Sequence, residues 1–291
     1  MFVQVEGNRI FYRSFGPERD GPTLLGLHGG PGATHDYLTP LEDLTRYGYR
    51  VVLYDALGCG ESERVTDASL FTLSQDVRRL EGVRQALGLG RVHLLGSSYG
   101  GLLALAYALE HPENLRSVVT TGGLANVPLA SSEMERLKSE LPPETLATLR
   151  SHEAKGEFQH PDYLRAVEVF YRRHVCRLDP WPEPVTYSLT HLSLPVYETM
   201  NGPNEFTIVG NIRDIDLTPR LHELDLPLLV TTGRYDEVTP KVGQAIVDRV
   251  PGSRLWVLPN SSHMGFWEER STYMAGVGEF LRSVDEGRRE P

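Results

Sequence analysis

LLGSSYGGLLAL, residues 94–105, joins two apolar runs through a short segment of glycine and serine. The first run ends at Gly96 and predicts a buried strand, and the second starts near Gly100 and predicts an apolar helix. Only three residues separate these glycines, so the turn between strand and helix must be sharp. A side chain at the apex of such a turn is exposed, which makes this turn a candidate for chemistry.

Ser98 is the candidate nucleophile in this turn. The segment fits the pattern G-x-S-x-G with Ser98 at its centre, whereas a centre at Ser97 would need glycine where Leu95 stands. In a strand-to-helix turn of this kind the central serine has a strained backbone and an exposed hydroxyl. The N–H groups at the start of the following helix also favour developing negative charge.

Strand-like and helix-like segments alternate along much of the chain. Residues 2–6 and 10–15 predict a hairpin. The further predicted strands are Thr23–Leu27, Arg50–Tyr54, Val92–Leu95, Ser117–Thr121, Pro227–Thr232 and Arg254–Leu258. The predicted helices that accompany them are Ser74–Leu87, Gly101–Glu110, Lys241–Val250 and Thr272–Val284. This alternation predicts an α/β fold with a mostly parallel central sheet flanked by helices on both faces.

The alternation is interrupted between residues 127 and 216. This part is rich in charged and aromatic residues and contains no apolar run typical of a buried strand. The helices predicted there are Ser132–Ser139, Pro143–Ser151 and Tyr163–His174. We therefore expect a core made of residues 1–126 and 217–291, with residues 127–216 inserted as a helical cap.

A serine hydroxyl is a weak nucleophile and needs a base, and His263 is the best-placed histidine. His263 follows the last predicted strand, and Asp236 follows the strand before it. Loops after parallel strands meet at one edge of the sheet, where Ser98 is also expected. The chain order Ser98, Asp236, His263 is that of an α/β-hydrolase triad, in which the acid holds the histidine tautomer. Glu237, next to Asp236, is an alternative acid.

The segment HGGPG, residues 28–32, follows the predicted strand Thr23–Leu27. Glycines in this position let backbone N–H groups face a bound carbonyl oxygen. We expect the N–H groups of Gly30 and Tyr99 to form an oxyanion hole beside Ser98.

Composition and charge exclude several classes of protein. A chain of 291 residues with 40% hydrophobic content can form a folded α/β domain. The net charge of −10 argues against nucleic acid or an anionic membrane surface as a partner. We find neither signal-peptide features nor a membrane-spanning run, so we expect a cytoplasmic protein.

The cysteines and the remaining polar residues indicate no second reactive site. The two cysteines, Cys59 and Cys176, are expected to be reduced thiols rather than a disulfide framework. We find no metal-ligand spacing and no phosphate-binding loop, so we expect no metal and no cofactor. The charged tail Asp285–Pro291 is expected to be frayed.

These motifs together resemble the proline iminopeptidase family of α/β-hydrolases, serine aminopeptidases with a helical cap. The likeness is strongest to the tricorn-interacting aminopeptidase group. Besides HGGPG and GSSYGG it extends through residues 54–62, 200–207, 235–240 and 262–268. It therefore covers nearly the whole chain, including the helical insertion.

The resemblance implies release of the N-terminal amino acid from short peptides through an acyl-enzyme. It also implies that Glu205 and Glu237 hold the substrate amine, with Tyr197 assisting. Independently of the resemblance, Glu205 lies beside an aromatic residue in a loop rich in glycine and proline, which suits a cation in a partly apolar pocket. Members of the family often have a polar and an aromatic residue where Ala56 and Leu57 stand. The resemblance therefore implies that the pocket for the first substrate residue differs in shape from that of the family.

Two alternative activities use the same triad. One is hydrolysis of amino-acid amides or esters at the same amine site. The other is carboxylesterase or lactonase activity on neutral substrates, in which case Glu205 is only structural. A third alternative, a hydrolase-fold binding protein without activity, is disfavoured because a binder needs no base behind a serine.

Overall fold

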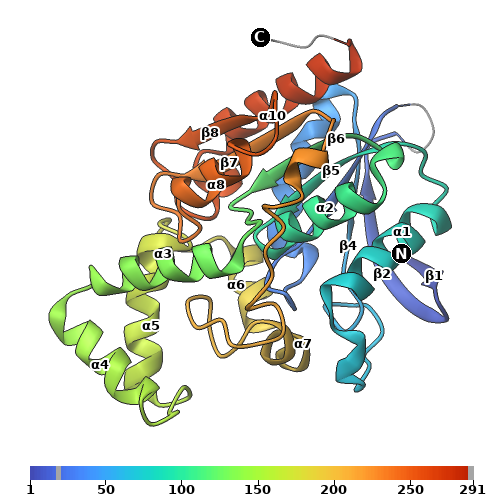
Figure 1. Cartoon of the computed structure of the whole chain (residues 1–291). Coiled ribbons are helices and arrows are strands. Elements are labelled where there is room, and N and C mark those ends of the chain that lie inside the picture. Colours follow the sequence, from blue (N-terminus) through green and yellow to red (C-terminus); the bar gives the residue numbers. More distant parts are fainter. Residues whose placement is uncertain (18–20, 288–291) are drawn as a thin grey trace.

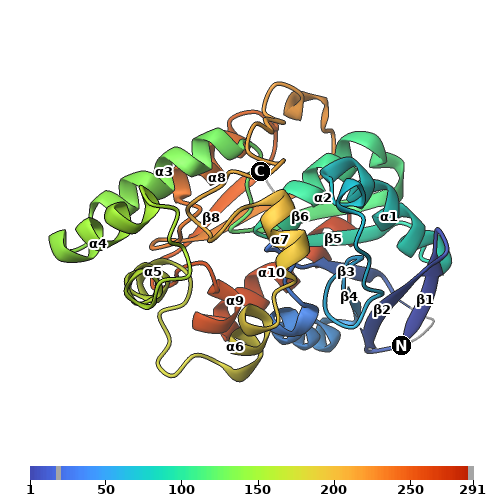
Figure 2. The same cartoon turned by 90° about the horizontal axis from the view of Figure 1, so that it is seen from below.

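An eight-stranded sheet forms the centre of the protein (Figures 1 and 2). The computed structural model describes residues 1–17 and 21–287. In space the strands follow the order β1-β2-β4-β3-β5-β6-β7-β8. Their bounds are β1 Phe2–Val5, β2 Asn8–Phe15, β3 Thr23–Leu27, β4 Arg50–Tyr54, β5 Val92–Ser97, β6 Leu115–Thr121, β7 Leu228–Gly233 and β8 Arg254–Leu258.

The first two strands form a hairpin, and the rest of the sheet is mostly parallel. β1 pairs antiparallel with β2, and β2 pairs antiparallel with β4. The remaining neighbours in the sheet run parallel. In the hairpin turn Glu6 and Gly7 have φ of 52° and 83°, the positive values that match the twist of the flanking strands. β5 is buried along its whole length, as expected for a central strand covered on both faces.

Helices cover both faces of the sheet, and each face has its own hydrophobic core. Residues of α1, α2 and α8 belong to the buried cluster on one face. Residues of α9, α10 and the 3₁₀ helix η1 belong to the cluster on the other face. The bounds are η1 His35–Tyr47, α1 Leu73–Ala86, α2 Tyr99–Glu110, α8 Pro240–Val247, α9 Gly265–Glu268 and α10 Arg270–Asp285, with short 3₁₀ helices at η2 Ala68–Leu70, η3 Pro112–Asn114 and η4 Leu221–Glu223.

Asp285 is bound to the body of the protein, so the prediction of a tail frayed from this residue onward was wrong. Its carboxylate accepts hydrogen bonds from Tyr49 at 3.0 Å and from Arg116 at 3.0 Å. Both partners lie far back in the chain, and local sequence gives no sign of such contacts. Residues 288–291 of the predicted tail lie outside the described residues.

Five helices lie between β6 and β7, and Figure 1 shows them below the sheet. Their bounds are α3 Val127–Ser139, α4 Pro143–Glu153, α5 Pro161–His174, α6 Glu183–Thr190 and α7 Leu194–Met200. The chain enters and leaves this helical segment at one place, because Asn126 and Asp216 form an isolated antiparallel bridge. We call α3 to α7 and their connections the cap; its boundaries as a domain stay a prediction.

The cap helices differ in detail from the predicted ones. α3 begins at Val127 rather than Ser132, because the Asn126 side chain accepts the N–H of Leu129 at 2.7 Å and caps the helix. α6 and α7 were not predicted. With eight and seven residues they are too short to display a helical period.

Candidate active site

Ser98 alone connects β5 to α2. Its backbone has φ of 56° and ψ of −121°, a conformation that non-glycine residues rarely adopt. The flanking glycines make this turn possible. A Cβ on Gly96 would lie 2.0 Å from the carbonyl oxygen of Gly100, and a Cβ on Gly100 would lie 2.3 Å from that of Leu27. The pattern quoted from the sequence therefore corresponds to a turn in which neither glycine can carry a side chain.

His263 and Asp236 meet through a short hydrogen bond. Nδ1 of His263 lies 2.7 Å from Oδ1 of Asp236, and both residues are buried. The carboxylate is oriented by the N–H of Val238 at 2.8 Å and the hydroxyl of Thr232 at 3.2 Å. Gly122, which follows β6, makes room for the pair, because a Cβ there would lie 2.5 Å from the imidazole ring.

One cavity brings the predicted nucleophile, the predicted base and the two predicted amine-binding acids together. Its polar lining includes Ser98, His263, Glu205 and Glu237, and Gly30 also lines it. The rest of the wall is largely apolar and is formed by Ala33, Tyr37, Val175, Val185, Ser188, Leu189, Leu192 and Met264. Among the described residues, the Ser98 hydroxyl and the His263 ring are not hydrogen-bonded to each other; such bonds often form only when substrate is bound.

One half-buried and one buried carboxyl group face this cavity. Glu205 accepts a hydrogen bond from the hydroxyl of Tyr197 at 2.7 Å, and its N–H donates to the hydroxyl of Tyr171 at 3.3 Å. Glu237 is 1% exposed, and its Oε2 has no hydrogen-bond partner within the described chain. Burial raises the pKa of both groups, and the charge of Glu205 raises that of Glu237 further. An additional positive charge here would stabilise both carboxylates.

The same acids act on His263. Burial alone would lower the pKa of the imidazole, but the charge and hydrogen bond of Asp236, with the charges of Glu237 and Glu205, outweigh it and raise the pKa to about 10. Oε1 of Glu237 lies 4.0 Å from Nε2 of His263. Three carboxyl groups therefore act on a single imidazole.

Of the two predicted oxyanion donors, Gly30 lines the same cavity as Ser98 and Tyr99 follows Ser98 in the chain. Gly30 lines the cavity with φ of 106°. Tyr99 is the first residue of α2, so its N–H has no partner one helical turn earlier. The ring of Tyr99 turns away from the cavity, and its hydroxyl donates to Asp76 at 2.6 Å. Only the backbone of Tyr99 is thus available beside Ser98.

Ala56 and Leu57 line a second, smaller space rather than the cavity of Ser98. They lie there with Tyr99, Phe71 and Met200. The loop that carries them is fixed to the HGGPG segment, because the N–H of Ala56 donates to Nε2 of His28 at 3.0 Å. Ala56 and Leu57, the two residues that differ from the family pattern, therefore lie behind the Ser98 turn and do not line the cavity of Ser98.

The alpha/beta hydrolase fold family matches residues 22–270. A proline iminopeptidase from Saccharolobus solfataricus is 43% identical over 285 residues, which cover 97% of this chain and 92% of that protein. The crystal structure of VinJ has a TM-score of 0.95 at 36% identity, covering 98% of both chains. That of a proline iminopeptidase from Mycobacterium smegmatis has a TM-score of 0.92 at 37% identity, covering 99% of both chains. The chain belongs to the proline iminopeptidase family.

The α/β-hydrolase fold and the family resemblance drawn from the motifs are therefore confirmed. Within residues 1–17 and 21–287, no helix of this proline iminopeptidase family member combines the length and the apolar character needed to cross a membrane.

The end of cap helix α5 holds the acid loop and the histidine loop together, a contact that sequence reasoning missed. The carbonyl oxygen of His174 accepts the N–H of Glu237 and the N–H of His263, both at 3.2 Å. The next carbonyl, of Val175, accepts the N–H of Met264 at 3.1 Å. The sequence marks His174 only as the last residue of a predicted helix, and a helix end with free carbonyl groups is the one signal that could have suggested this contact.

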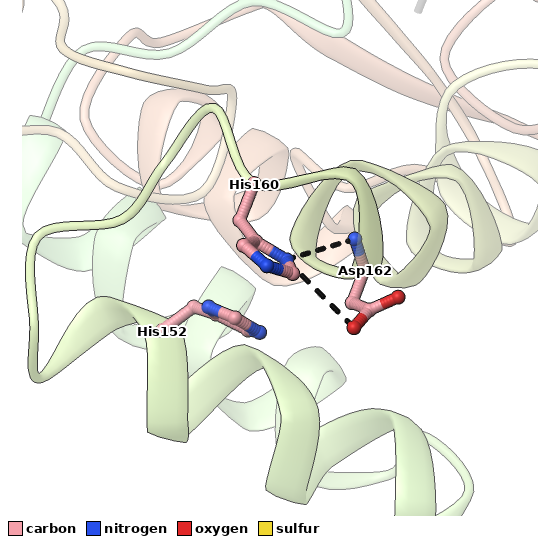
Figure 3. Close-up of side chains that lie close together, drawn as sticks. All are labelled: His152, His160 and Asp162. Atoms are coloured by element: carbon pink, nitrogen blue, oxygen red, sulfur yellow. Dashed lines mark hydrogen bonds and ion pairs between the residues drawn. The ribbon is translucent and has the colours of Figure 1, made fainter.

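A second group of polar side chains lies in the cap (Figure 3). Ligand atoms of His152, His160 and Asp162 lie within 4.8 Å of one another. Nδ1 of His152 lies 2.8 Å from Oε2 of Glu157, and Nδ1 of His160 accepts the N–H of Asp162 at 3.2 Å, which caps α5. The two rings stack with 22° between their planes. This group is explained as a helix cap, and its residues are not among those that line the Ser98 cavity.

Proposed function

We propose that this protein is a prolyl aminopeptidase that releases the N-terminal residue of short peptides through an acyl-enzyme. The observation that carries the proposal is a pair of carboxyl groups, the half-buried Glu205 and the buried Glu237, in the cavity of Ser98 and His263. Neither forms an ion pair with lysine or arginine in the described part of the chain. A substrate that brings its own cation suits such a cavity.

The proposed reaction begins at Ser98. Its hydroxyl oxygen attacks the carbonyl carbon of the first residue while Nε2 of His263 takes the hydroxyl proton. Asp236, bound to Nδ1, holds the ring and stabilises the imidazolium that forms. The N–H groups of Gly30 and Tyr99 stabilise the negative oxygen of the tetrahedral intermediate.

The intermediate then collapses. The peptide C–N bond breaks, His263 gives its proton to the leaving amine, and the first residue stays bound to Ser98 as an ester. A water molecule, deprotonated by His263, attacks this ester and releases the amino acid. The charged amine of the first residue lies at Glu205 and Glu237 throughout, with the Tyr197 hydroxyl fixing Glu205. Binding of the amine beside the serine limits cleavage to the first peptide bond.

The names of the relatives support proline as the first residue, since proteins 36% to 43% identical over nearly the whole chain are proline iminopeptidases. The apolar wall of the cavity, with Val185 and Leu192 from the cap side, suits the uncharged ring of proline. Two buried free thiols, Cys59 and Cys176, are compatible with a reducing compartment, and a cytoplasmic location is part of the proposal.

Product analysis tests the proposal. The protein is incubated with tripeptides that differ only in the first residue, with the matching amino-acid amides, and with small neutral esters. Mass spectrometry should detect the free first residue and the remaining dipeptide, with the fastest release from peptides that begin with proline. Faster turnover of the simple amides would favour an amino-acid amide hydrolase. Turnover of neutral esters alone would favour a carboxylesterase and would contradict the proposal.

A further inference from the structure

The charges around His263 are unbalanced. Three carboxyl groups face its ring: Asp236 and Glu237 from the loop after β7, and Glu205 from the cap. Three tyrosines are also titratable here: Tyr37 lines the cavity, and the hydroxyls of Tyr171 and Tyr197 bond to Glu205. Burial raises the pKa of all three phenols. Near Asp236, burial lowers the pKa of His174 and raises that of Glu268 of α9. No lysine or arginine is among the described residues that line the cavity.

The two nitrogens of His263 face different acids. Nδ1 is bound to Asp236 at 2.7 Å, and Nε2 lies 4.0 Å from Oε1 of Glu237. A carboxylate near Nε2 favours the protonated ring, and the pKa of His263 is raised to about 10. The proposed reaction needs the opposite state, because Nε2 can accept the Ser98 proton only if it carries none. A proton on Nε2 is therefore the inactive form of the base.

We propose that the ammonium group of the substrate and the proton on Nε2 of His263 compete for the carboxylates of Glu205 and Glu237, so that amine binding frees the base. This inference rests on the proposed function, in which the amine lies between those carboxylates. The step balances in charge and atoms: one ammonium enters, and one proton leaves Nε2 for water. The neutral Nε2 then accepts the Ser98 proton.

This competition gives the substrate amine two roles: it binds the substrate, and it promotes loss of the proton from Nε2 of His263. A neutral substrate brings no charge that competes for the carboxylates, so it meets a smaller fraction of active enzyme than a substrate with a charged amine does. A substrate with a charged amine converts the enzyme to its active form on binding. Selection for free N-termini then acts on kcat as well as on KM.

NMR titration of the His263 ring tests the inference in the full-length Ser98→Ala variant, which binds substrate without cleaving it. Saturating prolyl-alaninamide, whose only charge is its amine, should lower the pKa of His263 by about 1–3 pH units, the size expected when a nearby charge is neutralised. In the ligand-free protein, Glu205→Gln and Glu237→Gln should each lower the same pKa. Glu133→Gln is the matched control, because Glu133 is also buried but pairs with Lys241 and Thr239 outside the cavity.

The outcomes separate this inference from the proposed function. If prolyl-alaninamide binds and the pKa of His263 does not move, the inference is overturned while the proposed function stands. If prolyl-alaninamide does not bind, the proposed function is overturned and the inference with it. If Glu205→Gln and Glu237→Gln change the pKa of His263 no more than the control Glu133→Gln does, the two carboxylates do not hold the proton on His263. The inference is then wrong.

Discussion

Oε1 of Glu237 lies 4.0 Å from Nε2 of His263, whereas Oδ1 of Asp236, the preceding residue, lies 2.7 Å from Nδ1 of the same ring. Two acids adjacent in the chain thus face opposite nitrogens of one imidazole. The sequence favoured Asp236 as the partner of the histidine and kept Glu237 as an alternative. The geometry favours Asp236 for that role and leaves Glu237 facing the cavity, where a substrate amine is proposed to bind.

Asp236→Asn should therefore damage catalysis far more than Glu237→Gln when the substrate is a small neutral ester. Loss of the carboxylate removes the acceptor that fixes the Nδ1–H tautomer, a change that costs about 10⁴-fold in kcat in related triads. Glu237→Gln should not lower kcat on the ester, because it leaves the Nδ1 contact intact and removes a carboxylate that favours the protonated ring. Steady-state kinetics on one ester measures both. A larger loss for Glu237→Gln would reverse the two assignments.

Ser98→Ala should abolish activity, by about 10⁴- to 10⁶-fold in kcat, because covalent catalysis then has no nucleophile. Ser97→Ala is the matched control. Its hydroxyl is buried without a hydrogen-bond partner among the described residues, so its removal should change kcat/KM only a few-fold. A fluorophosphonate adduct should map to Ser98 by mass spectrometry. An adduct on Ser97 would refute the assignment.

The two thiols should not take part in the reaction. Burial raises the pKa of Cys59 well above its usual value, and it raises that of Cys176 to about 11, so neither is a thiolate at neutral pH. Cys59→Ala and Cys176→Ala should each keep kcat/KM within a few-fold of the wild type. Iodoacetamide should modify neither thiol in the folded protein. Rapid alkylation coupled to loss of activity would show that a thiol had been overlooked.

Glu81 should stabilise the fold only above strongly acidic pH. Hydrogen bonds, first from Arg84 and then from Tyr107 and Gln85, outweigh burial and lower the pKa of its carboxyl to about 2. A carboxyl whose pKa is lower in the folded state contributes stability above its unfolded pKa of about 4.3 and loses it as the pH falls toward 2.

Urea unfolding of the wild type and Glu81→Gln at several pH values measures this effect. The difference in free energy of unfolding should be largest above pH 5 and should shrink as the pH falls toward 2. Glu110→Gln, an exposed glutamate at the end of α2, is the control and should show little difference at any pH. An equal difference for Glu81→Gln at pH 2.5 and pH 6 would contradict the account.

The parts of the site that were predictable depend on local pattern. The Ser98 turn was predictable because its two glycines are required by backbone contacts within a few residues and by β3 alongside. Asp236 and His263 were predictable because each follows a parallel strand, and such strands end at one edge of the sheet.

The long-range contacts that cap residues make, with the core and with one another, were not predictable from local pattern. The carbonyl of His174 holds both catalytic loops, and the hydroxyl of Tyr171 meets the N–H of Glu205 across 34 residues. Neither residue has a neighbouring motif that distinguishes it from an ordinary residue of an amphipathic helix. Such contacts depend on how the cap docks on the sheet, which is set by many apolar contacts at once.

The most direct test of the central claim is the ratio of kcat/KM for a prolyl arylamide to that for its N-acetylated form, measured in the wild type and in Glu205→Ala. Removing one partner of a buried charge pair costs about 2–5 kcal/mol, which corresponds to about 30-fold to several thousand-fold. The account predicts a wild-type ratio of at least about 30 and a collapse of that ratio in folded Glu205→Ala. A wild-type ratio near one, or a high ratio that Glu205→Ala leaves unchanged, would contradict recognition of the free amine at this site.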